Sequence, residues 1–591
     1  MTYSILFSSH RLLKALVILG ACSIAGAILY PRLAAGWFGA IERHFRNLAR
    51  NRRRAILAAA LFPMVVRVLM LPWYPPPPAQ IHDEFSYLLQ GDTFAHGRVT
   101  NPTPPYWEHF ETEYTLFQPT YASQYQPAQG LLLAFGEVVF QNPWWGVWLS
   151  VGLMCGALCW ALFEIVPPVW ALAGALGAAL QIGIFGLWMN SYFGGAAAAT
   201  AGALIVAALA RIGRGRKLTG SAALCAFGII LTFATRPFEA LLWSGIAAAF
   251  CCWYVLKKRW RPRTVFVRLL LPFVLVFGCG ASALAWYNWR LTGNPADPPY
   301  LAYRRIYGTP QPYWWQPPVT ASGFRYAELR DNYLNQLRLY DERDSASALL
   351  TAERERTANF WRFFVGPFFT PALLFLPWLL RERRIRPWLF ASIPFILAKA
   401  TFHAWYPAHS APETILIVLV MLECWRHMRV FRRRGGVGVA LSRALVAAAC
   451  FTIFIGSAGR AFEPFLLRHK LVHLPPIWES LYPARRLRDD VTARLAKIPG
   501  KHLVFVKYAS GHCFCEEWVF NSADIPEQRI VYARPYTLES DLALARSLSD
   551  FDVWVIEPDK HPYNLARLQT GSQWAGLTET DEDGQDNESS R

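Results

Sequence analysis

The chain has 591 residues, of which 54% are hydrophobic, 15% aromatic and 17% charged, and its mean hydropathy is +0.20. This composition indicates an integral membrane protein rather than a soluble or disordered chain. The net charge of +18 does not by itself indicate a nucleic-acid partner, because basic residues of a multi-span protein collect in the loops on one side of the membrane. We therefore expect membrane lipids and no nucleic acid as partners.

Apolar stretches of about 18 to 20 residues recur along the chain, and each is long enough to cross a hydrocarbon core about 30 Å thick as a helix. They predict an α-helical polytopic bundle of about 11–12 transmembrane helices. The expected spans lie near 12–30, 55–73, 143–163, 168–187, 194–211, 219–235, 238–256, 268–287, 361–380, 388–402, 411–428 and 439–458. The first also resembles a signal peptide, so its cleavage near Ala25 to Ala27 is the alternative to a retained helix.

Short basic loops alternate with these spans. Five share one side, because an even number of spans separates each from the next, and the positive-inside rule identifies that side as the cytoplasm: 43–54, 211–217, 257–268, 381–386 and 426–434. The turn at 164–168 is assigned to the same side although it is not basic. The segments 74–128, 189–195, 235–239, 288–360 and 402–410 then lie outside and hold most of the unusual polar residues. The active face is therefore predicted to be extracytoplasmic.

The first outer loop, 74–128, carries the strongest candidate for chemistry. It begins with four prolines at 75–78, which stiffen the exit from the membrane, and then presents Asp83 and Glu84 side by side in the string HDEFSY. An acidic pair usually solvates a loop or caps a helix, here one starting near Phe85. A carboxylate that is partly desolvated at a membrane boundary has a raised pKa and can instead accept a proton from an incoming hydroxyl.

The remainder of this loop is rich in aromatic, amide and acidic groups, a surface that suits a carbohydrate better than a lipid tail. The candidate acceptor or sugar-binding residues are Tyr87, Glu108, His109, Glu111, Tyr125 and Gln126. Glu108, His109 and Glu111 also form a polar cluster that could bind a divalent ion together with Glu84 or His82. No fixed spacing selects a metal, so a divalent cofactor is possible and none is assigned.

Beyond the last span, the stretches 502–508, 529–534 and 552–558 read as short buried strands, with a helical stretch between the last two. They predict a small extracytoplasmic α/β domain. Cys513 and Cys515 lie there within GHCFCEE, where His512 makes a weak metal motif; we expect a structural role, and direct pairing of the two is disfavoured because it forces a tight ring.

Four segments follow from these features. They are an additional N-terminal helix with a basic cytoplasmic segment (1–54), the membrane domain (55–458), the outer α/β domain (459–577) and an acidic, disordered tail (578–591).

The motif HDEFSY after an early span, followed by YQPAQGLLLAF leading into the membrane, resembles the GT-C superfamily of membrane glycosyltransferases, in particular the protein mannosyltransferase, aminoarabinose transferase and Rgt-like branches. The similarity covers roughly residues 55–458. It implies a GT-C-like bundle, a polyprenyl-phosphate-linked sugar as donor, and a catalytic acid in the first outer loop. That acid maps onto Asp83, with Glu84 beside it. YQPAQG departs from the more usual double proline of the family.

Transfer from a glycosyl phosphate also needs cationic groups where charge develops on the departing phosphate. Arg236 in TRPFE is favoured, because an arginine at the end of a span presents a planar fork of donors. Arg290, His403 and His409 are secondary candidates. Their alternative roles are a snorkelling Arg290 and an aromatic belt containing passive histidines.

The sequence thus predicts a multi-pass enzyme of the inner (plasma) membrane that moves a sugar to an acceptor hydroxyl on an unidentified glycan, lipid or protein. A transporter or lipid flippase is the alternative, although it would place ionisable residues near the bilayer midplane rather than at one mouth. An inactive scaffold that anchors the outer domain is the third hypothesis.

Overall fold

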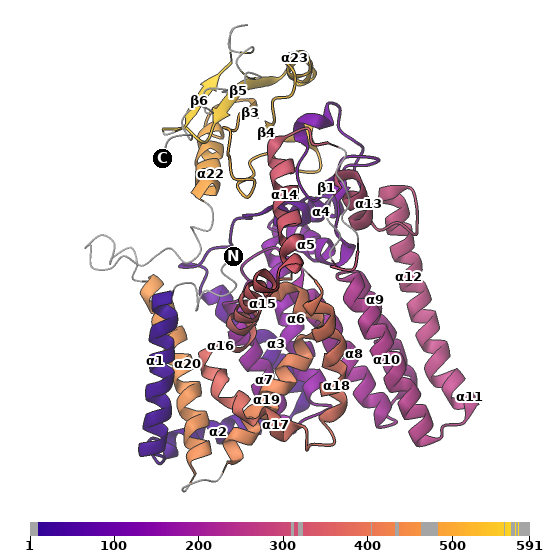
Figure 1. Cartoon of the computed structure of the whole chain (residues 1–591), viewed down its shortest axis with the longest axis vertical. Helices are drawn as coiled ribbons and strands as arrows, with labels where there is room; N and C mark the ends of the chain where they lie inside the picture. Colours follow the sequence, from indigo (N-terminus) through magenta and orange to yellow (C-terminus); the bar gives the residue numbers. More distant parts are fainter. Residues whose placement is uncertain are drawn as a thin grey trace.

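The computed structural model describes residues 10–308, 313–316, 323–402, 405–431, 436–461, 483–560 and 562–568, together with residues 574 and 577. Figure 1 shows a helical bundle in its lower part, a small sheet-containing domain at the top, and the outer-loop elements between them. The acidic tail 578–591 and His403 lie outside the described residues.

The bundle consists of apolar helices that coincide with the expected spans. Their bounds are α1 (His10–Leu29), α3 (Arg52–Leu69), α6 (Trp144–Leu162), α7 (Pro168–Ala178), α8 (Gly195–Gly213), α9 (Leu218–Phe233), α10 (Pro237–Lys258), α11 (Pro262–Val265), α12 (Leu271–Thr292), α16 (Gly366–Phe369), α17 (Leu376–Leu379), α18 (Arg386–Ala400), α19 (Thr414–Val430) and α20 (Val437–Ala461). The stretch expected at 361–380 is divided into short helical pieces, because Pro367, Pro371 and Pro377 remove backbone donors.

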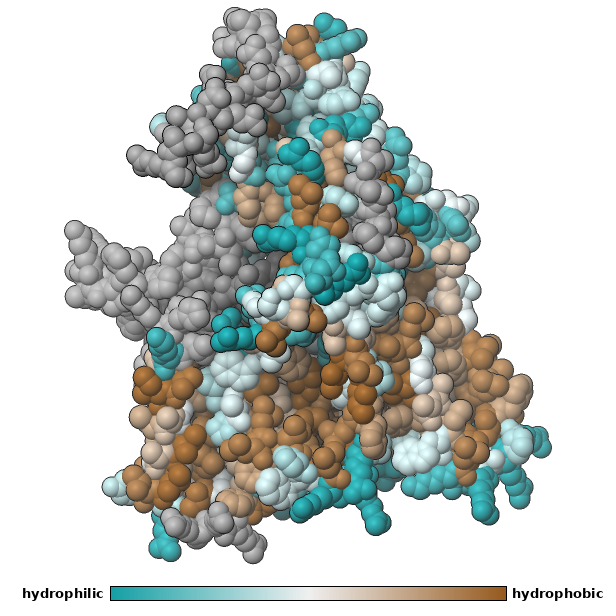
Figure 2. Space-filling model, viewed as in Figure 1, coloured by the Kyte–Doolittle hydropathy of each residue, from teal (hydrophilic) through white to brown (hydrophobic). Residues whose placement is uncertain are grey.

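Among the described residues, six helices are long and apolar enough to cross a membrane, and five shorter apolar helices accompany them. Figure 2 shows the apolar side chains as a broad band around the bundle, with hydrophilic residues along its lower rim and over the upper part of the molecule. The predicted fold class, a helical polytopic membrane protein with a small C-terminal sheet domain, is confirmed.

Ion pairs join the loops that were assigned to the cytoplasmic side. Glu164, from the turn without basic residues, is buried and accepts hydrogen bonds from Arg52 at 2.6 Å and from Arg214 at 2.9 Å. Nearby, Arg429 donates to Glu42 of the amphipathic helix α2 (Ala35–Arg50) at 2.7 Å. The neutral turn therefore lies beside two of the basic loops, as the topology prediction requires.

The elements above the bundle are α4 (His82–Ala95), η2 (Trp107–Phe110), β1 (Thr115–Leu116), β2 (Ala122–Ser123), α5 (Pro127–Phe140), α13 (Pro299–Tyr307), α14 (Ala327–Asp341) and α15 (Ala346–Phe360). The sequence did not predict α5 as a separate helix; it begins with Pro127, which suits the first helical position. Gln90 of α4 accepts from the backbone N–H of Gly130 at 3.1 Å, and a Cβ at Gly130 would lie 2.4 Å from the Gln90 side chain. Gly130 therefore permits the close approach of α4 and α5.

The C-terminal domain contains α22 (Pro483–Leu495), β3 (Lys501–Val506), β4 (Ile530–Ala533), α23 (Leu538–Ser547), β5 (Phe551–Glu557) and β6 (Asn564–Arg567). The sheet order is β4-β3-β5-β6, with β3 parallel to β4 and β5, and β6 antiparallel to β5. The three predicted strands and the helix between the last two are confirmed, while β6 was not predicted.

The two faces of this sheet are buried differently. Val504 and Val506 of β3 pack with Val491 of α22, whereas Leu503 and Phe505 face the opposite way, as alternation along a strand requires. This second face forms one apolar cluster with Leu89, Phe110, Phe117 and Tyr121 of the first outer loop. The C-terminal domain and the first outer loop therefore share a core.

Candidate active site

Asp83 lies in the first turn of α4, where the unpaired N–H groups of the helix favour a carboxylate. Its side chain is half-buried and accepts a short hydrogen bond from the hydroxyl of Tyr125, which precedes α5. Burial raises the pKa of Asp83, and the Tyr125 hydroxyl together with the charge of Arg236 offsets this only in part. Asp83 thus has the environment expected of a proton acceptor.

Arg236 approaches the same place from a distant part of the sequence. The backbone N–H of Ala128, at the start of α5, donates to the carbonyl of Ala234 at 3.0 Å, which holds the turn before α10 against the residues that follow Tyr125. Arg236 consequently lies within electrostatic range of Asp83, Tyr87 and Tyr125. The structure thereby brings together the predicted base and the favoured phosphate-binding cation.

Two aromatic rings lie beside these charges. Tyr87 and Tyr125 are stacked with their ring centroids 4.2 Å apart and their planes 15° apart. Gln126, the next residue, is buried at the N-terminal cap of α5. Tyr87 and Tyr125 therefore lie beside Asp83, with Gln126 next in the sequence, and the sugar-binding role expected of the three residues stays a prediction.

Glu84 has a different environment from its neighbour. Its carboxylate is buried and accepts from the backbone N–H groups of Gln80 at 2.8 Å and Tyr192 at 3.0 Å. Burial raises the pKa of Glu84 to about 7. Both carboxylate oxygens are occupied by backbone donors, so Glu84 joins the proline-rich exit to the segment 189–195 rather than facing a substrate. The catalytic role predicted for Glu84 gains no support from this geometry.

The secondary cation candidates lie at different places. His409 is within electrostatic range of Arg236 and lines a hollow beside it, together with Lys399, Glu239 and Trp405. Arg290 is exposed near the end of α12, with its guanidinium 6.0 Å from the ring centroid of Trp286. That is the position of a snorkelling side chain, and the structure does not bring Arg290 to Asp83.

Glu108, His109 and Glu111 are occupied by contacts with other outer segments. His109 is fully buried, with its Nδ1 2.8 Å from the carbonyl of Arg534 and its Nε2 2.8 Å from the hydroxyl of Ser540. Glu111 accepts from Arg325 at 2.6 Å, and the carbonyl of Glu108 accepts from the hydroxyl of Tyr326 at 2.9 Å. His109 and Glu111 therefore take part in docking the C-terminal domain and the segment 323–360, and the acceptor-binding role expected for Glu108, His109 and Glu111 stays a prediction.

A buried charged cluster beside Asp83 was missed by sequence reasoning. Glu113 is buried, and burial raises its pKa well above the ordinary value. Glu517 of the C-terminal domain is also buried; Arg534 pairs with it and holds its pKa below the ordinary value against the effect of burial. Arg534 also donates to Glu328 at 2.8 Å. The available signal was the occurrence of acidic residues within otherwise aromatic strings.

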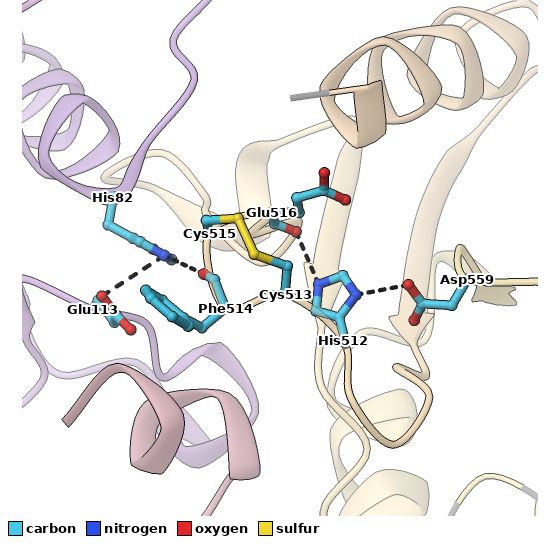
Figure 3. Close-up of a disulfide and its surroundings, with 8 residues drawn as sticks. All are labelled: His82, Glu113, His512, Cys513, Phe514, Cys515, Glu516 and Asp559. Atoms are coloured by element: carbon cyan, nitrogen blue, oxygen red, sulfur yellow. Dashed lines mark hydrogen bonds and ion pairs between the residues drawn. A yellow bond between two sulfur atoms is a disulfide. The ribbon is translucent and has the colours of Figure 1, made fainter. Parts of the chain in front are cut away.

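Cys513 and Cys515 form a disulfide, although their short separation was expected to disfavour direct pairing. Figure 3 shows the turn that it closes, with the carbonyl of Phe514 directed at His82. The His82 Nε2 lies 2.6 Å from this carbonyl and 3.7 Å from the Glu113 carboxylate. Because a carbonyl only accepts hydrogen bonds, Nε2 carries the proton of a neutral His82. Burial accordingly lowers the pKa of His82.

The possible metal sites are not supported by this arrangement. The sulfur atoms of Cys513 and Cys515 are bonded to each other. The His512 Nδ1 lies 2.8 Å from the carboxylate of Asp559. In the part of the chain that the structure describes, the ligand-like group Glu382, Glu423 and His427 has its atoms within 4.8 Å of one another, but Arg384 and Arg426 pair with these carboxylates. The guanidinium groups of Arg384 and Arg426 therefore supply the positive charge that a metal ion would supply beside these carboxylates.

No family model matches the chain, and no curated protein matches it. The structure is similar to the crystal structure of ArnT from Cupriavidus metallidurans bound to undecaprenyl phosphate, at 13% identity and a TM-score of 0.44, over 85% of this chain and 92% of that one. It is also similar to the oligosaccharyltransferase of Archaeoglobus fulgidus in the apo form, at 11% identity and a TM-score of 0.38, over 85% of this chain and 69% of that one.

Proposed function

We propose that this chain is a membrane glycosyltransferase that moves a sugar from a polyprenyl-phosphate donor to an acceptor hydroxyl at the extracytoplasmic face of the inner membrane. One observation carries the proposal. Asp83 and Arg236, which are far apart in the sequence, lie within electrostatic range of each other and of the stacked rings of Tyr87 and Tyr125. A base, a cation and an aromatic wall at the outer mouth of a helical bundle are the groups that this reaction requires.

The reaction is a single displacement at the anomeric carbon. The acceptor oxygen forms the new bond as the bond from that carbon to the phosphate oxygen breaks, and the phosphate leaves with the electron pair. Asp83 takes the acceptor proton, and Arg236 stabilises the negative charge that develops on the polyprenyl phosphate. The transition state resembles an oxocarbenium ion, and attack on the face opposite the phosphate inverts the anomeric configuration.

Two features support the outer placement of this site. The Cys513–Cys515 disulfide is typical of an oxidising compartment, which the cytoplasm is not. At the other end of the bundle, Glu164 and Glu423 are paired with arginines from the basic loops, which the positive-inside rule assigns to the cytoplasm. Asp83 and its neighbours are at the end that holds the disulfide.

The test uses the purified full chain in lipid with a panel of polyprenyl-phosphate sugars, and follows release of polyprenyl phosphate and transfer to candidate acceptors. Asp83→Asn is expected to reduce turnover by about 10²–10⁴-fold, the usual contribution of a general base, with donor affinity retained. Arg236→Ala is expected to weaken donor binding. Matched controls are Glu137→Gln, a half-buried acid on α5, and Lys257→Ala, at the opposite end of α10 from Arg236.

Unchanged turnover in Asp83→Asn would remove Asp83 from the chemistry, and unchanged donor affinity in Arg236→Ala would remove the phosphate role of Arg236. Movement of the intact lipid-linked sugar between leaflets without any transfer would support a flippase instead. The sugar and the acceptor are identified by whichever members of the panel are consumed.

A further inference from the structure

The C-terminal domain makes several direct contacts with α4, the helix that carries Asp83. Arg98, which follows α4, donates to both carboxylate oxygens of Asp524 at 2.8 and 2.5 Å, and Asp92 accepts from the backbone N–H of Ala523 at 2.6 Å. The ring of Phe85 is stacked on Phe520 with centroids 3.7 Å apart. Residues 520–524 therefore contact α4 in its first turn, in its last turn and in the segment that follows it.

The disulfide-closed turn makes the contact nearest to Asp83. The Phe514 carbonyl accepts from His82, the residue before Asp83, and the buried His82 lies beside the turn (Figure 3). On the other side of the turn, His512 is fixed between Asp559 at 2.8 Å and the carbonyl of Glu516 at 3.1 Å. The turn that carries the Phe514 carbonyl is thus held on both sides, by His82 and by the contacts of His512.

A general stabilising role explains this disulfide poorly. The stabilisation that a cross-link gives by restricting the unfolded chain grows with the length of the loop it closes. Cys513 and Cys515 are only 2 positions apart, so this effect is small. The domain is held to the outer loop mainly by the shared apolar cluster and by Arg534. The chief effect of the bond is therefore local: it restricts the direction of the Phe514 carbonyl.

We propose that the Cys513–Cys515 turn is a positioning element of the transfer site, which holds His82 through the Phe514 carbonyl and thereby fixes the first turn of α4 and the Asp83 carboxylate. This inference rests on the proposed function for its catalytic consequence, and His82 acts through Asp83 without touching substrate. A misplacement of a reacting group by about 1 Å can cost about 10²-fold in rate, so positioning has a measurable effect.

The test compares three variants of the full chain in lipid. Cys513→Ser/Cys515→Ser opens the turn, His82→Leu removes the donor to Phe514, and His82→Gln restores an N–H donor at a similar distance from the backbone. The control is Cys252→Ser/Cys279→Ser, which replaces two free, exposed cysteines of the bundle. Steady-state transfer gives kcat and the donor KM, and hydrogen–deuterium exchange reports on the amides of residues 82–95.

The serine pair and His82→Leu are expected to lower kcat at least about tenfold with an unchanged donor KM, and to speed exchange in the first turn of α4 while leaving β3–β5 protected. His82→Gln is expected to recover most of the rate, which a merely structural role for the ring would not allow. Wild-type kcat and exchange in the serine pair would overturn the proposal, as would faster exchange throughout the C-terminal domain.

The two readouts separate this inference from the proposed function. If the unmodified chain transfers no sugar, the proposed function fails, and the exchange at residues 82–95 still decides whether the turn positions α4. If transfer occurs but neither readout responds to loss of the disulfide, the positioning role alone fails.

Discussion

Asp83 and Glu84 are adjacent in the sequence but have separate tasks. Asp83 is half-buried, hydrogen-bonded by the Tyr125 hydroxyl and within range of Arg236, whereas both oxygens of Glu84 accept from backbone N–H groups. Successive side chains of a helix point about 100° apart, so a neighbouring pair in its first turn faces two different surroundings. The acidic pair is therefore one candidate base and one structural carboxylate.

The Tyr125 hydroxyl is expected to tune the base. Its hydrogen bond favours the ionised form of Asp83, so Tyr125→Phe raises the pKa of Asp83 further and a higher pH is needed to keep the base ionised. We expect the acidic limb of the kcat/KM profile to move upward by roughly one pH unit, the equivalent of one charge-assisted hydrogen bond.

Tyr121→Phe is the matched control for this measurement, since its hydroxyl donates to the carbonyl of Asn521 at 3.2 Å in the same loop but not to Asp83. A downward movement of the acidic limb in Tyr125→Phe, or an equal movement in both variants, would contradict the assignment.

At the scale of elements, close helix packing in the bundle depends on particular glycines. A Cβ at Gly195 would lie 2.0 Å from Nε1 of Trp188, so the glycine permits close packing against this ring. Farther along α8, a Cβ at Gly202 would lie 1.7 Å from the carbonyl oxygen of Pro412 in η8 (Pro407–Glu413). The obstacle there is backbone, which cannot rotate away as a side chain does.

Gly202→Ala is therefore expected to force α8 from η8 and to destabilise the chain by about 1–3 kcal/mol, seen as a lower Tm in detergent. Gly245→Ala is the control, because Gly245 lies inside α10 with nothing within 4 Å of its Cβ position. The control is expected to retain or raise stability, by up to about 1 kcal/mol, because alanine favours a helix interior over glycine. Equal Tm values for the two variants would mean that the bundle relaxes around the added methyl group.

At the scale of the whole molecule, the sequence predicted the local elements well and the contacts between distant elements poorly. Hydropathy located the bundle helices, and short β-branched runs located β3, β4 and β5, because each signal is contained within its own segment. Asp83, Tyr125 and Arg236 were chosen for their chemistry, and the structure brings them together. The docking surface of His109, Glu111 and Arg534 was not foreseen, since no local pattern encodes a partner several hundred residues away.

The position of the basic loops predicts how the whole chain is oriented across the membrane. In intact cells, a membrane-impermeant maleimide is expected to label Ser549→Cys, on the exposed side of the C-terminal domain, and to label Arg261→Cys in a basic loop only after permeabilisation. The background lacks the exposed free cysteines Cys22, Cys252, Cys279 and Cys450. The opposite pattern would place Asp83 in the cytoplasm and remove the proposed function with it.

The contact between His82 and Phe514 joins positions 432 residues apart, with most of the bundle between them. At about 5–20 residues per second, the ribosome needs roughly 20–90 s to synthesise that interval. Throughout this time the nascent chain already has its Asp83 helix but lacks the turn that meets it. The nascent chain therefore inserts its bundle helices before its reaction centre is complete. Activity requires that the C-terminal domain has first been exported.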